Sequence, residues 1–304
     1  MSTPVTLTMS TMIDQTLDEL YRLSERPYQT TVGSNDLTSS AADVTLTLGD
    51  GTLVNVSDIL EVDAELLLVT GKSADATPVF TVTRRYAGTA LAAHAVDSVV
   101  LKSPEFTRTQ VKSRIERFFS GPAHTYLPSI TSESMQRQPD LQYVIMPATT
   151  VRILSVRHFN TLTGRVIDVA GWRFEEDLPT DVVATTKLLR LPAIISDDDE
   201  LVVSWQTTYA WSPTPVTEAS TISAPLGVED LPVLWASAYL VSRREVTRLE
   251  LDTVEEWNQE QATRLGVSLR QVRDLWGEFY RRVDEARKTQ YIPRHRVFRK
   301  MPIP

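Results

Sequence analysis

The stretch 226–288 constrains the fold most, because it carries two long amphipathic helical patterns. In the first, Asp230 is a candidate N-cap, and Pro232 lies in the first turn, where a missing backbone N–H costs nothing. Apolar residues then recur at three- and four-residue steps, at Leu231, Leu234, Trp235, Ala238 and Val241. This spacing predicts a helix over 231–250 with one apolar face, which must pack against another element or against a neighbouring copy.

The second pattern begins with a capping box at 268–271 and predicts a helix that runs to residue 288. Its apolar face carries Leu269, Val272, Trp276, Phe279, Tyr280 and Val283. Another capping box, at 253–256, predicts a short helix between the two long ones, and Gly266 is expected to end it. We expect core packing or subunit–subunit contacts from six residues of the long helices: Leu234, Trp235, Val241, Trp276, Phe279 and Tyr280.

Two shorter helical patterns complete the set, one at 11–24 and one at 106–120. Helices that are separated by sheets in the sequence pack together most economically as one bundle. The predicted fold class is therefore α+β, with a helical-bundle core, an inserted small β-module, a second antiparallel β-domain (a sandwich or a barrel) and an extended C-terminal arm.

Strand patterns lie between the helices. In the first β-region, alternating apolar residues begin at Val44, and the turn residues 49–51 predict a hairpin into 53–56. Further strands are expected at 65–69, 79–84 and 98–101. In the second β-region, five short strands between 141 and 209 indicate an antiparallel sandwich or barrel. The polar stretches 30–42 and 212–224 are expected to be linkers.

These patterns divide the chain into six parts. They are an N-terminal helix and linker (1–40), an inserted β-module (41–103), a core helix and linker (104–140), an antiparallel β-domain (141–215), the C-terminal core helices (216–288) and an extended basic arm (289–304). The net charge of −8 argues against a sequence-specific nucleic-acid binder, because such domains usually present a basic face. The chain has no cysteine, no apolar run of the ~18–20 residues that a membrane span needs and no secretory-signal pattern.

The last part of the chain is basic and carries no acidic residue after Ala286. Two interpretations remain open, a solvated tail and an extended arm that docks on an acidic partner surface. The second explains why apolar residues alternate with the charges, since an arm that adds to a partner's sheet or groove needs both. The candidate binding residues of this arm are Tyr291, Ile292, Arg294, Arg296, Val297, Phe298, Arg299 and Lys300.

Sequence motifs for chemistry are weak. The four histidines, His94, His124, His158 and His295, form no closely spaced pair of the kind that binds zinc. The acidic run 197–200 lacks the ligand spacing of a calcium loop, and the acids at 175–177 suit an exposed turn better than a glycosidase pair. No nucleotide-binding loop or nucleophile elbow occurs. We therefore expect no catalytic, cofactor-binding or metal-binding residue, and a protein that is not an enzyme.

Three segments carry a family resemblance: Glu-Val-Asp-Ala-Glu-Leu-Leu-Leu-Val-Thr-Gly at 61–71, Val-Thr-Arg-Arg-Tyr-Ala-Gly-Thr-Ala at 82–90 and Ala-Ala-His-Ala-Val at 92–96. Together they resemble a β-cassette of the virion proteins of tailed bacteriophages. Arg85 stands where that pattern often has glycine, so the turn is expected to differ here. The order of helix, cassette, helix, β-domain and the helix from Leu231 is similar to the head-to-tail connector (adaptor) proteins of siphophages. The likeness spans most of the chain, although 141–210 matches only in kind.

This resemblance implies a structural function. Connector subunits form a homo-oligomeric ring, typically a dodecamer, whose C-terminal arm reaches the portal protein. The ring extends the channel through which double-stranded DNA passes without being read, and it carries the next neck or tail-terminator protein. The implied location is the neck of the virion, with assembly in the host cytoplasm and no membrane contact. The alternatives are another neck, tail-terminator or baseplate protein, or a carbohydrate-binding or carbohydrate-active virion protein that works through its second β-region.

Overall fold

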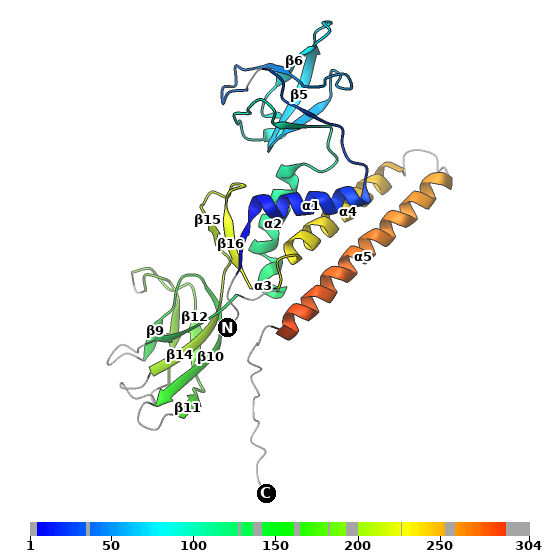
Figure 1. Ribbon diagram of the computed structural model, residues 1–304. Helices are drawn as coiled ribbons and strands as arrows, with labels where there is room; N and C mark the ends of the chain where they lie inside the picture. Colours follow the sequence, from blue (N-terminus) through cyan, green and yellow to red (C-terminus); the bar gives the residue numbers. More distant parts are fainter. Residues whose placement is uncertain are drawn as a thin grey trace.

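A computed structural model describes most of the chain, namely residues 5–34, 37–126, 129–135, 142–160, 165–181, 183–192, 200–225, 227–252 and 259–289. Over these residues the chain is a mixture of helices and antiparallel strands, with the strands in four sheets. Figure 1 shows a β-module at one end, the helices in the middle and a second β-region at the other end.

The described residues contain five α-helices: α1 (Met9–Leu23), α2 (Arg108–Ser120), α3 (Pro122–Tyr126), α4 (Leu231–Asp252) and α5 (Gln259–Thr289). The helices predicted at 11–24, 106–120 and 231–250 are confirmed within about two residues. A capping box starts α2, because the Thr107 hydroxyl accepts the N–H of Gln110 and the Gln110 side chain accepts the N–H of Thr107.

The predicted break between the short helix and the last long helix, at Gly266, is wrong. Gly266 does not end a helix, and no new helix starts at Ser268, because α5 runs through both positions. A glycine inside a helix costs about 1 kcal/mol relative to alanine, which does not by itself end a helix whose other residues favour it.

Six strands form the first β-module: β2 (Gln29–Thr31), β3 (Thr45–Thr47), β4 (Ile59–Val62), β5 (Glu65–Lys72), β6 (Val79–Thr83) and β7 (Val99–Lys102). A short 3-10 helix, η1 (Tyr86–Gly88), lies between β6 and β7. The strand order is β2-β7-β4-β5-β6-β3, and a bridge between Val32 and Leu48 joins the two outer strands. The sheet is therefore curled around an apolar interior that includes Leu60, Leu67 and Phe80.

The hairpin predicted through 49–51 is wrong. β3 pairs with β6 instead, and residues 53–56 form no strand. Gly51 meets a packing requirement, since a Cβ there would lie 2.7 Å from the ring of Phe80. The stretch 30–42, expected to be a linker, also contributes most of β2 and three buried residues, Thr30, Val32 and Leu37, to the module.

The second β-region contains seven strands among the described residues. They are β8 (Ser129–Met135), β9 (Tyr143–Ile145), β10 (Thr150–Asn160), β11 (Arg165–Asp168), β12 (Arg173–Glu175), β13 (Leu188–Arg190) and β14 (Glu200–Thr207). They form two antiparallel sheets, ordered β11-β10-β14-β8 and β12-β13-β9. One hydrophobic cluster, which includes Val144, Val156, Leu189 and Trp205, draws on both sheets.

A small third sheet joins segments that the sequence places far apart. It consists of β1 (Val5–Thr8), β15 (Trp211–Ser212) and β16 (Thr221–Ala224), in the order β1-β16-β15. The stretch 212–224, expected to be a linker, is thus partly paired with the N-terminal residues. This sheet leads the chain directly into α1 and packs against the helices through Ile222 and Ala224.

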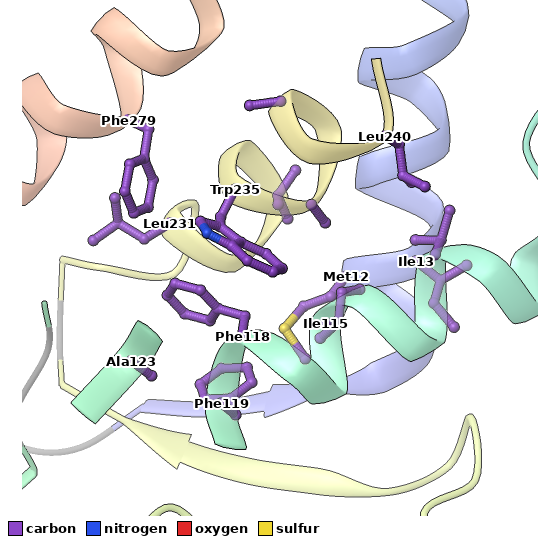
Figure 2. Close-up of a cluster of buried hydrophobic side chains, with 14 of the residues drawn as sticks. Met12, Ile13, Ile115, Phe118, Phe119, Ala123, Leu231, Trp235, Leu240 and Phe279 are labelled. Carbon is purple, nitrogen blue, oxygen red and sulfur yellow. The ribbon is translucent and has the colours of Figure 1, made fainter. Parts of the chain in front are cut away.

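The predicted helical-bundle core is wrong. The described chain is strand-rich, and its buried apolar residues form three separate clusters, two of them built by sheets. The third cluster is shared by helices and the β1-β16-β15 sheet. Figure 2 shows Phe118 of α2 close to Trp235 of α4, with Phe279 of α5 and Met12 of α1 around them. An apolar helix face reveals that it is buried, but it does not reveal that the sheets bury cores of their own.

Candidate functional site

The first candidate site surrounds the carboxylate of Glu65, at the start of β5. Arg84 donates to it from Nε at 2.9 Å and from Nη2 at 2.7 Å. The backbone N–H groups of Arg85 and Ala92 donate at 3.1 and 3.0 Å, and Nε2 of His94 lies 3.0 Å away. We call Glu65, Arg84, His94 and Asp63 the Glu65 clasp.

Three of the four side chains of the clasp are buried. The side chains of Glu65, Arg84 and His94 are at most 2% exposed, and Nδ1 of His94 lies 2.8 Å from the exposed carboxylate of Asp63. Burial alone would raise the pKa of Glu65, but the bonds from Arg84 and the backbone N–H groups lower it to about 2. Both oxygens of Glu65 are therefore occupied by protein donors, which suits a structural tie better than a reacting group.

The turn after the clasp arginine has a left-handed backbone at Arg85. Arg85 has φ 58° and ψ 31°, in the left-handed region that glycine enters most easily. Ala87 and Gly88 also have positive φ, at 52° and 78°. The resemblance predicts a different turn because Arg85 replaces glycine, yet the backbone at this residue has the conformation that glycine favours.

The second candidate site joins the β-module to the helices. Glu61 of β4 is buried, and its Oε1 accepts the backbone N–H of Arg108 at 2.6 Å, at the start of α2. Its other oxygen has no hydrogen-bond partner among the described residues. Burial raises the pKa of Glu61 to about 8, so this carboxyl group is neutral at pH 7.

The side chain of Arg108 extends the same junction. It pairs with Glu218 through two bonds, of 3.1 and 2.7 Å, and with Asp14 of α1 at 2.6 Å. Thr109 adds a bond from its hydroxyl to the carbonyl of Ala64 in the β-module. These contacts bring together α1, α2, the β-module and the segment before β16. Sequence reasoning missed them, because the charged residues involved are scattered along the chain.

The six residues expected at the core or at subunit contacts lie in two settings. Trp235, Val241 and Phe279 are buried inside this chain, and Leu234 and Trp276 pack against the same cluster while partly exposed. Tyr280 is 50% exposed, and its ring stacks on Trp276 at 6.0 Å. The chain itself covers most of these apolar faces, and Tyr280 is the member of the set with the most accessible surface.

An open groove of about 390 Å³ lies beside α2. Its lining consists of Ser113, Glu116, Arg117, Phe119, Ser120, Tyr209, Trp211 and Val216. Phe119 makes edge-to-face contacts with Tyr209 and Trp211, at 5.3 and 5.4 Å. The carboxylate in this lining, Glu116, lies 3.7 Å from Lys112. A glycosidase needs two carboxylates flanking the bond that it cleaves, so the lining does not suit that reaction.

The remaining candidate residues do not converge. His94 belongs to the clasp, His124 lies against Tyr209 with ring centroids 5.8 Å apart, and His158 lies on β10. His295 lies outside the described residues, as do the acidic residues 197–199 and the capping box at 253–256. All eight arm residues are also outside them: Tyr291, Ile292, Arg294, Arg296, Val297, Phe298, Arg299 and Lys300.

Comparison of the chain with protein-family models, with curated proteins and with solved structures found no match. Among the described residues, no group of three or more histidine and acidic side chains is placed to hold a metal ion. None of the helices in the same part of the chain is both long and apolar enough to cross a lipid bilayer.

Proposed function

We propose that the chain is a structural subunit of the head–tail connector of a tailed bacteriophage. Copies form a ring that docks on the portal, extends the DNA channel and carries the next neck or tail protein. One observation supports this proposal most directly. The three segments that carry the resemblance to phage virion proteins contribute Glu65, Arg84 and His94 to a single buried clasp. The resemblance therefore rests on residues that act together in the fold.

The arrangement of the molecule suits a connecting role. The two β-regions lie at opposite ends of the helices, which gives the subunit separate surfaces for different partners (Figure 1). An acidic chain also suits a channel wall, since a net charge of −8 disfavours tight capture of the DNA backbone. In this proposal the ring is a dodecamer, and the basic arm 289–304 docks on the portal.

Deletion of residues 289–304 tests the arm. The shortened chain keeps the clusters that bury its core, so we expect it to fold but not to join portal-bearing heads. Circular dichroism measures the folding, and a head–connector binding assay measures the attachment. A full-length variant with four exposed arginines outside the arm changed to alanine, Arg22, Arg26, Arg173 and Arg190, controls for the four positive charges lost. Unchanged attachment of the shortened chain would refute the arm assignment.

Native mass measurement and negative-stain images of the full chain, with and without portal protein, test the ring. Rings that bind portal support the connector proposal. Rings that bind tails but not portal favour another neck, tail-terminator or baseplate protein. Specific binding of a glycan by a chain that forms no ring would instead favour the carbohydrate-binding alternative.

A further inference from the structure

The strand β11 is an exposed sheet edge. It is the outer strand of the sheet β11-β10-β14-β8, and among the described residues no strand pairs with its outer side. All four of its residues are exposed, including Val166 at 57% and Ile167 at 51%. Free backbone groups on a sheet edge can pair with another strand, and proteins often protect such an edge with charges, proline, a bulge or a covering loop. β11 carries a charge at each end, Arg165 and Asp168, with its two exposed apolar residues between them.

The opposite edge strand of the same sheet, β8, runs in the direction needed for antiparallel pairing with β11 of another copy. Among the described residues this sheet has four strands, and each neighbouring pair is antiparallel. The two edge strands, β11 and β8, therefore run in opposite directions. A second copy placed edge to edge would continue the antiparallel pattern across the contact. Such a contact joins two different surfaces, so it can repeat from copy to copy and close into a ring.

Strand register shows which residues share a face of the sheet. Ile167 pairs with His158, His158 with Leu201, and Leu201 with Met135, so these four residues lie on one face, the face of the buried Leu201. Side chains alternate along a strand. Arg165, two residues before Ile167, and Glu133, two residues before Met135, therefore lie on that same face.

Charge selects one register for the contact. Placing Arg165 opposite Glu133 of the neighbouring copy keeps each face continuous and sets a positive charge against a negative one. The same register puts Val166 opposite Ser132 and Ile167 opposite Thr131 of the neighbouring copy. Within the described part of one chain, Arg165 and Glu133 lie on strands at opposite edges of the sheet.

We infer that the β11 edge of one copy pairs with the β8 edge of the next, with Arg165 opposite Glu133, so that the sheet continues from copy to copy. The partner at this surface is a second copy of this chain. The inference rests on the ring in the proposed function, and it names the strands that form the contact.

An engineered disulfide tests the register, because the natural chain has no cysteine. The double variant Val166→Cys and Ser132→Cys is oxidised and run on a non-reducing gel. Within one chain β11 and β8 are three strand spacings apart, roughly 14 Å, which is beyond the reach of a disulfide. We expect a ladder of trimers and larger products that reductant abolishes. A pairing of two identical edges would stop at dimers and would overturn the inference.

A matched pair of cysteines controls for random collision. The variant Val99→Cys and Ser132→Cys moves one thiol to the β-module, where Val99 is 45% exposed. We expect much less multimer from this variant at the same concentration. Equal ladders from the two variants would overturn the inference, because random collision would then account for them.

A charge exchange tests the contact without a covalent bond. Arg165→Glu places two acids opposite each other and is expected to weaken self-association in sedimentation measurements. Adding Glu133→Arg restores opposite charges in exchanged positions and is expected to restore association. Failure of the second change to rescue the first would count against this register.

The outcomes separate this inference from the proposed function. If native mass measurement shows rings of the unaltered chain while the cysteine ladder does not form, the edge contact is wrong and the connector proposal stands. If the chain stays monomeric both alone and with portal protein, the ring itself is wrong, and the edge contact fails with it.

Discussion

The stability of the fold depends on the protonation of Glu61. The carboxyl group is buried at the junction of the β-module and α2, with one oxygen bound by a backbone N–H and the other without a partner among the described residues. Its pKa rises from the ordinary 4.5 to about 8, chiefly because burial disfavours the charged form, although the N–H and charge of Arg108 oppose this. The neighbouring charges are Arg108, Glu218 and Asp14. The charged form of Glu61 also contributes to the raised pKa of Tyr21.

The sign of the pH effect follows from the raised pKa. Between about pH 4.5 and pH 8 the folded chain holds a proton on Glu61 that the unfolded chain has released. The free energy of unfolding contributed by this group therefore falls as the pH rises through that range and is level above it. Glu61→Gln removes the effect while keeping an acceptor for the N–H of Arg108. We expect the variant to melt a few degrees higher than the parent at pH 8.

Calorimetry from pH 4.5 to pH 9 measures the difference between the two melting temperatures. The difference should shrink towards pH 4.5, because there the protonation of Glu61 in the folded parent costs little free energy. Glu25→Gln is the control, because Glu25 is an exposed acid outside this junction. A Glu61→Gln variant that melts at the parent's temperature across the whole range would contradict a buried neutral carboxyl group.

At the scale of elements, two glycines separate helix propensity from packing. Gly277 lies inside α5, and a Cβ added there meets no atom within 4 Å. We expect Gly277→Ala to raise the free energy of unfolding by about 0.5–1 kcal/mol, because alanine loses less backbone entropy in a helix. In Gly51→Ala, by contrast, the new methyl group would lie 2.7 Å from the Phe80 ring inside the β-module. We expect that variant to lose stability.

Urea unfolding followed by circular dichroism compares the two glycine variants. Opposite signs for Gly277→Ala and Gly51→Ala are the expected result, since the same chemical change occurs in open space in one case and against a buried ring in the other. Destabilisation by Gly277→Ala would show that another surface covers this side of α5.

At the scale of the whole molecule, the three separate hydrophobic clusters of the described residues predict unfolding in more than one step. The β-module has its own cluster and its own ionic tie, the Glu65 clasp. Glu65→Gln leaves Arg84 buried without its counter-charge, which typically costs 3–5 kcal/mol. We expect this change to lower one calorimetric transition, assigned to the β-module, and to leave the others in place.

The exposed member of the clasp supplies the control. Asp63 also contacts His94, but its side chain is 62% exposed, so Asp63→Asn should cost about 1 kcal/mol or less. Calorimetry of both variants checks the assignment. A single transition that moves as a whole in Glu65→Gln would mean that the chain unfolds as one cooperative unit.

Local patterns determined much of the secondary structure. The apolar spacing from Leu231 to Val241 and the stripe that ends near Val283 predicted two long helices, and both are present. Most strands of the second β-region are predicted in the same way, but β8 is missed, and the single strand expected over 166–174 is two strands, β11 and β12, in different sheets. Such predictions succeed because periodicity and capping depend on residues close together in the chain. They fail where the end of a helix is predicted from residue propensity alone, as at Gly266, through which α5 continues.

Long-range pairing was decided only by the tertiary structure. The sequence did not indicate that β3 pairs with β6, that β1 pairs with β16 or that the helices share the molecule with two sheet-built cores. The clasp shows the same limit, since the sequence pattern contains Glu65, Arg84 and His94 but does not indicate that their side chains are in contact. A strand carries no local record of its partner, because backbone hydrogen bonds are alike at every register. Only the joint burial of distant side chains selects one pairing.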